Sequence, residues 1–197
     1  GGRGGAGRCY DQLVRARIPE LRAKLSGTRP VDGRLEALAL GVIPLEVASP
    51  ASISPLPSEV DIPVEAYLSA LAFTHAASNN AERIAWQPLI KIGEYLVFYD
   101  DGSAAAIPIE YGGNICAASR RYGEPLWPAY YRHEGYIGTW FADPVSLKTA
   151  DGDDLTLYEF IWQNPEPAKK VAFVRLRGLG DTDAGILLYK LKAAIQQ

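Results

Sequence analysis

The segment from Lys91 to Tyr111, KIGEYLVFYDDGSAAAIPIEY, constrains the fold more than any other part of the chain. Its first half alternates between the two sides of an extended strand, and Asp101-Gly102 then supplies a turn that tolerates positive φ. We therefore predict a β-hairpin with strands at 93–100 and 103–111. Pro108 cannot donate to a hydrogen-bond ladder, so the return strand should lie at a sheet edge or carry a bulge.

The chain after residue 35 keeps this character throughout. Apolar segments of strand length recur, among them LTLYEFIWQN, KKVAFVRLRG and AGILLYKLKAA, and Gly, Pro and Asn-Pro pairs separate them. We expect about eight to ten strands, at the spacing of an all-β sandwich or barrel. The predicted module covers residues 35–197.

In the part that precedes the strands, apolar residues recur with a different period. Apolar residues between 10 and 25 recur at helical spacing, with Pro19 as a kink or a second helix start and Gly27 as a stop. Residues 1–34 are therefore expected to be a flexible start followed by a short connector helix.

The first residues, GGRGGAGR, have no apolar core of a signal peptide, and the sequence contains no methionine. We interpret the chain as the C-terminal portion of a longer protein. Its localisation is therefore unknown, because any targeting signal would precede Gly1.

Composition excludes several classes of function. The net charge of -3 argues against a nucleic-acid interface, which needs a concentrated basic face. No apolar run approaches the roughly 20 residues of a membrane helix. Cys9 and Cys116 form no CxxC pair, so we expect two thiols rather than a metal site, with a disulfide between them as the alternative.

The most unusual stretch is RRYGEPLWPAYYRHEGYIGTWF, residues 120–141, where seven aromatic residues surround one of the two histidines. Tyrosine and tryptophan combine a large apolar area with a polar group, so they suit both sugar stacking and protein interfaces. Packing of a long loop onto the sandwich is an equally weighted alternative, and exposure of the rings would discriminate. The candidate ligand-binding residues are Trp127, Tyr130, Tyr131, Arg132, His133, Glu134 and Trp140.

Catalytic patterns are weak. No pair of carboxylates stands out as an acid and nucleophile, and no serine has a nucleophile-elbow context. We expect no catalytic residue, metal or cofactor in this chain. His75 is interpreted as a hydrogen-bonded histidine at a strand end, and Tyr158 and Trp162 as core residues. The DGDD segment, 151–154, is interpreted as a solvated turn, with a structural calcium site as the alternative.

Five motifs occur in an order that resembles a known module. They are EVDIPV, LAFTHA, IGEYLVFYDDGSAAAIPIEYGGNI, RHEGYIGTWFADP and LYEFIWQNPEPAKKVAFVRL, within residues 36–192. Together they resemble the C-terminal β-sandwich of large bacterial glycoside hydrolases, and are similar to that of the family 20 β-N-acetylhexosaminidases. The resemblance implies a galactose-binding-like, antiparallel jelly-roll sandwich attached to a TIM-barrel hydrolase, with residues 10–25 as the connector.

These observations favour a non-catalytic accessory module that binds carbohydrate or braces a catalytic domain. The expected partners are a carbohydrate and the catalytic domain of the parent chain, with no nucleic acid and no membrane. A purely structural, protein-interacting sandwich is the alternative, and an independent glycosidase is a further one.

Overall fold

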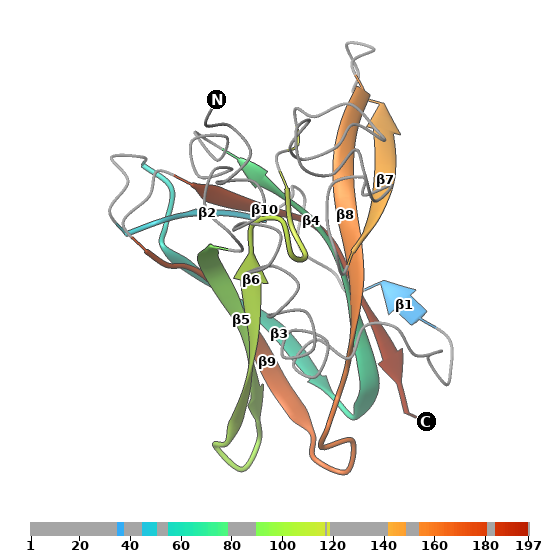
Figure 1. Ribbon diagram of the computed structural model, residues 1–197. Coiled ribbons are helices and arrows are strands. Elements are labelled where there is room, and N and C mark those ends of the chain that lie inside the picture. Colours follow the sequence, from blue (N-terminus) through green and yellow to red (C-terminus); the bar gives the residue numbers. More distant parts are fainter. Residues whose placement is uncertain are drawn as a thin grey trace, which may run out of the picture.

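The computed structural model describes residues 35–37, 45–50, 55–78, 90–116, 118, 142–148, 154–180 and 184–196. Within these ranges every regular element is a β-strand, and the strands form two antiparallel sheets (Figure 1). The prediction of an all-β protein with two antiparallel sheets is therefore confirmed. The expected connector helix at 10–25 lies outside the described residues, as does Cys9.

The larger sheet has six strands, in the order β1-β10-β4-β8-β7, with β2 also pairing with β10. All of its pairs are antiparallel, and β10 and β4 share the longest ladder. Its strands are β1 (Leu35–Ala37), β2 (Leu45–Ala48), β4 (Leu68–Ser78), β7 (Asp143–Lys148), β8 (Asp154–Gln163) and β10 (Gly185–Ile195).

The smaller sheet has four strands in the order β3-β9-β5-β6. They are β3 (Glu59–Ala66), β9 (Val171–Gly178), β5 (Lys91–Tyr99) and β6 (Ala104–Glu110). The predicted hairpin is confirmed, because β5 and β6 pair through a turn in which Gly102 has a φ of 83°. Strand β6 is the sheet edge expected from Pro108.

Both edges of the smaller sheet carry a proline. Pro108 lies in β6, and Pro63 lies in β3, where the register also shifts between Pro63 and Ala66. Glu65, inside that irregularity, has a φ of 51°, which an L-residue rarely adopts. The row of backbone hydrogen-bonding groups is thus interrupted in both outer strands.

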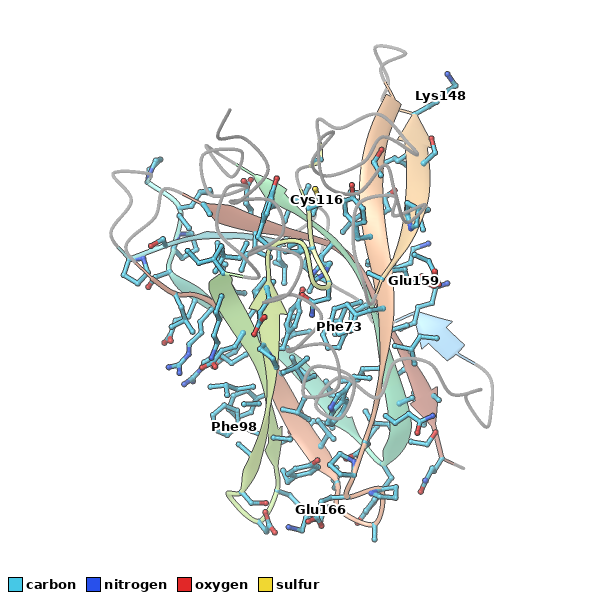
Figure 2. All side chains as sticks on the ribbon, in the orientation of Figure 1. Phe73, Phe98, Cys116, Lys148, Glu159 and Glu166 are labelled. Carbon is cyan, nitrogen blue, oxygen red and sulfur yellow. The ribbon has the colours of Figure 1, made fainter. Side chains whose placement is uncertain are left out.

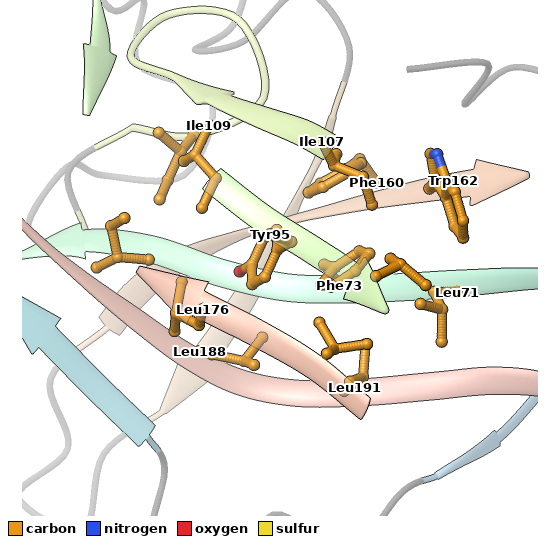
Figure 3. Close-up of a cluster of buried hydrophobic side chains, with 14 of the residues drawn as sticks. Leu71, Phe73, Tyr95, Ile107, Ile109, Phe160, Trp162, Leu176, Leu188 and Leu191 are labelled. Atoms are coloured by element: carbon orange, nitrogen blue, oxygen red, sulfur yellow. The ribbon is translucent and has the colours of Figure 1, made fainter. Parts of the chain in front are cut away.

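The core lies between the sheets and is rich in aromatic rings. The Phe73 ring, from β4, stacks on Tyr95 of β5 at a centroid distance of 4.1 Å and on Phe160 of β8 at 5.0 Å. Figure 3 shows Tyr95 and Phe73 projecting between the strands of the two sheets. Tyr158 and Trp162 are buried, as predicted.

The sheets approach each other closely where β9 passes β2. A Cβ atom on Gly178 would lie 2.4 Å from the Ala48 carbonyl oxygen, so only glycine fits at this position without backbone movement. The Gly178 N–H donates to the Ser58 carbonyl at 2.9 Å.

A second contact between the sheets lies beside the β5–β6 turn. The Tyr99 hydroxyl donates to Asn164 Oδ1 at 2.7 Å, and Asn164 Nδ2 donates to the Leu68 carbonyl at 2.8 Å. The Glu166 N–H also donates to Asn164 Oδ1, at 3.0 Å. Asn164 therefore joins β5, the start of β4 and the loop after β8.

Over the described ranges, no helix has the length and apolar character that crossing a membrane requires.

Candidate functional site

The seven ligand-binding residues predicted from sequence all lie outside the described residues. These are Trp127, Tyr130, Tyr131, Arg132, His133, Glu134 and Trp140. Their use as a binding loop stays a prediction, as does the turn or calcium site at 151–154, of which the structure describes only Asp154, the first residue of β8. The structure instead draws attention to a surface that the sequence analysis did not select.

This surface is the outer side of the four-stranded sheet. Along β5 and β9, alternate residues point into the core, as Tyr95 and Val174 do, while the residues between them face outward. Figure 2 shows Phe98 on the side of β5 that points away from Phe73 and the core. We call this surface the Phe–Arg face and define it by Asp61, Glu94, Phe98, Phe173, Arg175 and Arg177.

Two aromatic rings lie at one end of the Phe–Arg face, where β5 ends and β9 begins. Phe98 and Phe173 are direct cross-strand neighbours, and their rings stack at a centroid distance of 4.6 Å and an interplanar angle of 18°. The Arg175 guanidinium carbon lies 5.3 Å from the centroid of Phe98 and 5.6 Å from that of Phe173. This distance allows cation–π attraction to both rings, so the three side chains support one another's positions.

Arg175 is also fixed from the opposite side. Its Nε donates to Asp61 Oδ1 at 2.7 Å and its Nη2 donates to Asp61 Oδ2 at 3.0 Å, which is the two-point geometry that a guanidinium favours. The hydrogen bond from Arg175 lowers the pKa of the Asp61 carboxyl. Asp61 therefore stays ionised well into the acidic range, and the pair holds Arg175 in one orientation above the rings.

The second arginine of the face has a more buried partner. Arg177 Nε donates to Glu94 Oε1 at 2.6 Å, and Lys91 Nζ donates to Glu94 Oε2 at 2.8 Å. Burial raises the pKa of the Glu94 carboxyl, but the hydrogen bonds from Lys91 and Arg177 outweigh this effect, and the pKa lies below its ordinary value. Glu94 is thus held as a carboxylate between two cations.

The lowered pKa values of the two carboxyl groups on this face do not suit them to donating a proton. A general acid in glycoside hydrolysis needs a raised pKa, whereas Asp61 and Glu94 both have a lowered one. Phenylalanine and arginine are, by contrast, both enriched at protein interfaces. Within the part of the chain that the structure describes, no group of three or more His, Cys, Asp or Glu side chains could hold a metal ion.

The residues of this face do not stand out in the sequence, because its aromatic residues are not clustered there as they are at 120–141. The relevant pattern is an alternation in two separate segments, KIGEYLVFY and VAFVRLRG. Glu94 and Phe98 lie on the same side of the first strand, and Phe173, Arg175 and Arg177 lie on the same side of the second. Nothing in the sequence states that these two strands are neighbours. Only their pairing in the sheet brings the rings and charges together.

His75 lies where expected, hydrogen-bonded near the end of β4. The thiol of Cys116 is buried and lies 3.7 Å from the Tyr111 hydroxyl.

Comparison with known proteins yields no relative: no protein-family model, no curated protein and no solved structure matches this chain.

Proposed function

We propose that the chain is a non-catalytic accessory β-sandwich of a glycoside hydrolase, of the galactose-binding-like jelly-roll type, and that it braces the catalytic domain. The observation that carries this proposal is the preorganised Phe–Arg face. Its rings are stacked and its two arginines are already bound to carboxylates. Burying ion pairs that are already formed costs less than burying single charges, which suits the face to a protein partner.

The arrangement of the rings favours a protein over a sugar at this face. A sugar stacks on an aromatic ring through a flat and open ring face. Here Phe98 and Phe173 cover one face of each other, and a guanidinium lies over both. A protein surface can instead use the ring edges, the arginine and the paired carboxylate together.

Carbohydrate binding remains the second form of the proposal, and it belongs to the segment at 120–141. What supports it is the composition of that segment, in which Trp127, Tyr130, Tyr131 and Trp140 are near in sequence to Arg132, His133 and Glu134. Rings of this kind gain from contact with sugar C–H groups, while the charged groups bind hydroxyls. The alternatives are a purely structural interaction domain and an independent glycosidase.

The test is a titration of the chain against the catalytic domain encoded in the same reading frame. Phe98→Ala should weaken association by about tenfold or more, because it removes the ring stack and the support of Arg175. Tyr189→Ala is the matched control, since Tyr189 is an exposed aromatic residue on β10 of the other sheet. It should leave the affinity within about twofold.

If the native chain and Phe98→Ala bind the catalytic domain with equal affinity, the Phe–Arg face does not brace that domain. A parallel titration with mono- and oligosaccharides, on native chain and on Trp127→Ala, tests the carbohydrate form. Binding of a sugar that Trp127→Ala abolishes would favour that form instead.

A further inference from the structure

A histidine is among the fully buried polar residues of the described core. His75 lies in β4 with its side chain fully buried, and both ring nitrogens have partners that belong to the other side of the sandwich. Nδ1 lies 2.8 Å from the Tyr95 hydroxyl, on β5 of the smaller sheet, and Nε2 lies 2.8 Å from the Asn114 carbonyl oxygen. The ring therefore links β4 to the opposite sheet and to the loop that follows β6.

The partners of His75 decide which tautomer it adopts. A carbonyl oxygen can only accept, so Nε2 must carry the proton and donate to Asn114. In the neutral ring Nδ1 then has a lone pair, and the Tyr95 hydroxyl must donate to it. Both hydrogen bonds are thus satisfied by the neutral ring in one tautomer only.

The remaining surroundings of the ring are aromatic and apolar. Tyr95 and Phe160 lie at ring-centroid distances of 5.8 and 5.1 Å from His75. In the sheet, His75 is directly opposite Tyr158 of β8 and Leu188 of β10. None of these four side chains carries a charge that could compensate an imidazolium.

Charged groups on the same elements are engaged elsewhere. Glu159 of β8 accepts from the Thr74 hydroxyl at 3.0 Å, and Lys190 of β10 is exposed. On the loop side, Glu110 carries a buried carboxyl group at the end of β6, its backbone N–H donates to Asn114 Oδ1 at 2.9 Å, and the other titratable groups there are Tyr111 and Cys116. No carboxylate of the described residues contributes to the pKa of His75.

We propose that His75 is an acid-sensitive latch, which closes the sandwich while the ring is neutral and opens it at the Asn114 loop when the ring takes up a second proton. The added proton occupies Nδ1, so the Tyr95 hydroxyl can no longer donate there and must accept instead. Among the described residues the new charge has no counter-ion, so it is stabilised only by reaching water. In this proposal the part that moves aside is the loop 111–116, which is held to β4 by the His75 contact and by the Ala77 N–H donating to the Cys116 carbonyl at 2.8 Å. Its opening would also expose the buried side chains of Tyr111, Ile115 and Cys116.

The direction of the effect follows from linkage. Burial lowers the pKa of His75 from 6.5 to about 4, and the hydrogen bond to the Asn114 carbonyl only partly opposes this. The open state, with an ordinary pKa, binds the proton more tightly than the closed state. Closing is therefore favoured most above pH 6.5 and is progressively lost as the pH falls, by roughly 150-fold in the equilibrium constant at pH 4 and by roughly 300-fold at the acidic limit.

Hydrogen exchange on the intact chain measures this opening locally. After correction for intrinsic exchange, the Ala77 amide should open roughly 30-fold more often at pH 5 than at pH 7.5. The Asn164 amide, which donates to the Ser69 carbonyl at the other contact between the sheets, should change little. An Ala77 amide whose protection does not depend on pH would overturn the proposal.

Substitutions separate His75 from the other histidine. His75→Gln supplies a donor and an acceptor but does not titrate, so it should abolish the change in exchange between pH 7.5 and 5. His133→Gln is the matched control and should preserve it. Retention of the full pH effect in His75→Gln would contradict the latch.

The native protein provides a test that needs no variant. As the pH is lowered, NMR should show that the His75 ring stays neutral, with its proton on Nε2, until the latch opens. A ring that titrates near pH 6.5 without any change in exchange at Ala77 would likewise refute the proposal.

Discussion

Strand β5 sends two tyrosines into the core, and each contacts the six-stranded sheet in a different way. Tyr95 donates to His75, a titratable ring, in the middle of the aromatic core. Tyr99 donates to Asn164, an amide that does not titrate, beside the β5–β6 turn. Burial raises the pKa of Tyr95 well above its ordinary value and that of Tyr99 to about 12, so both hydroxyls keep their protons at any physiological pH.

The difference between the two contacts lies in the partner of each tyrosine. An amide keeps the same donors and acceptors at every pH, so the Tyr99 contact can hold the sheets together under acidic conditions. The imidazole of His75 loses its acceptor when it is protonated. One strand thus combines a pH-independent contact with a pH-dependent one, and the substitutions below test this division in order of decreasing effect.

Asn164→Ala should have the largest effect. It removes the acceptor of the Tyr99 hydroxyl and of the Glu166 N–H, and it leaves the buried Leu68 carbonyl without its side-chain donor. We expect a loss of about 3 kcal/mol in the free energy of unfolding, measured by urea denaturation at pH 7.5. Asn164→Asp retains the acceptor and should fall between native and alanine; an alanine variant with native stability would show that the contact is unimportant.

Tyr95→Phe should rank second. It removes only the hydroxyl and leaves Nδ1 of His75 buried without a donor, at a cost of about 2 kcal/mol at pH 7.5. The ring stack with Phe73 is retained, so near-ultraviolet circular dichroism should be close to native. A loss below about 0.5 kcal/mol would mean that the hydroxyl contributes little to holding the sheets together.

Gly102→Val tests the turn beside the Tyr99 contact. Gly102 has a φ of 83°, which a β-branched residue resists, although no atom would contact the added Cβ. The cost should be about 1 kcal/mol or somewhat more, seen as a lower thermal midpoint. Gly102→Asn is the control, because asparagine tolerates positive φ, and it should recover part of the loss.

Tyr99→Phe should have the smallest effect, about 0.5 to 1 kcal/mol, because Asn164 Oδ1 still accepts from the Glu166 N–H after the hydroxyl is removed. Its dependence on pH between 7.5 and 5 should match that of the native chain. A weaker dependence would mean that the two contacts are coupled.

Sequence patterns predicted the local parts of this fold and few of its long-range parts. The β5–β6 hairpin followed from alternation and Asp101-Gly102, and the position of β6 at an edge followed from Pro108. The strand order β3-β9-β5-β6 could not be predicted from the sequence, because it depends on which distant apolar strands pack best together. For the same reason the sequence predicted that His75 is hydrogen-bonded but not that Asn114, 39 residues away, is its partner.

The interrupted edges of the four-stranded sheet have a consequence for self-assembly. A strand added to an exposed edge needs a continuous row of N–H and C=O groups, as in domain-swapped chains and amyloid fibrils. Pro63 and Pro108 each lack an N–H, and the register of β3 shifts beside Glu65, which has a φ of 51°. The edges of this sheet are therefore poor templates for strand addition, while its Phe–Arg face keeps two aromatic rings partly exposed.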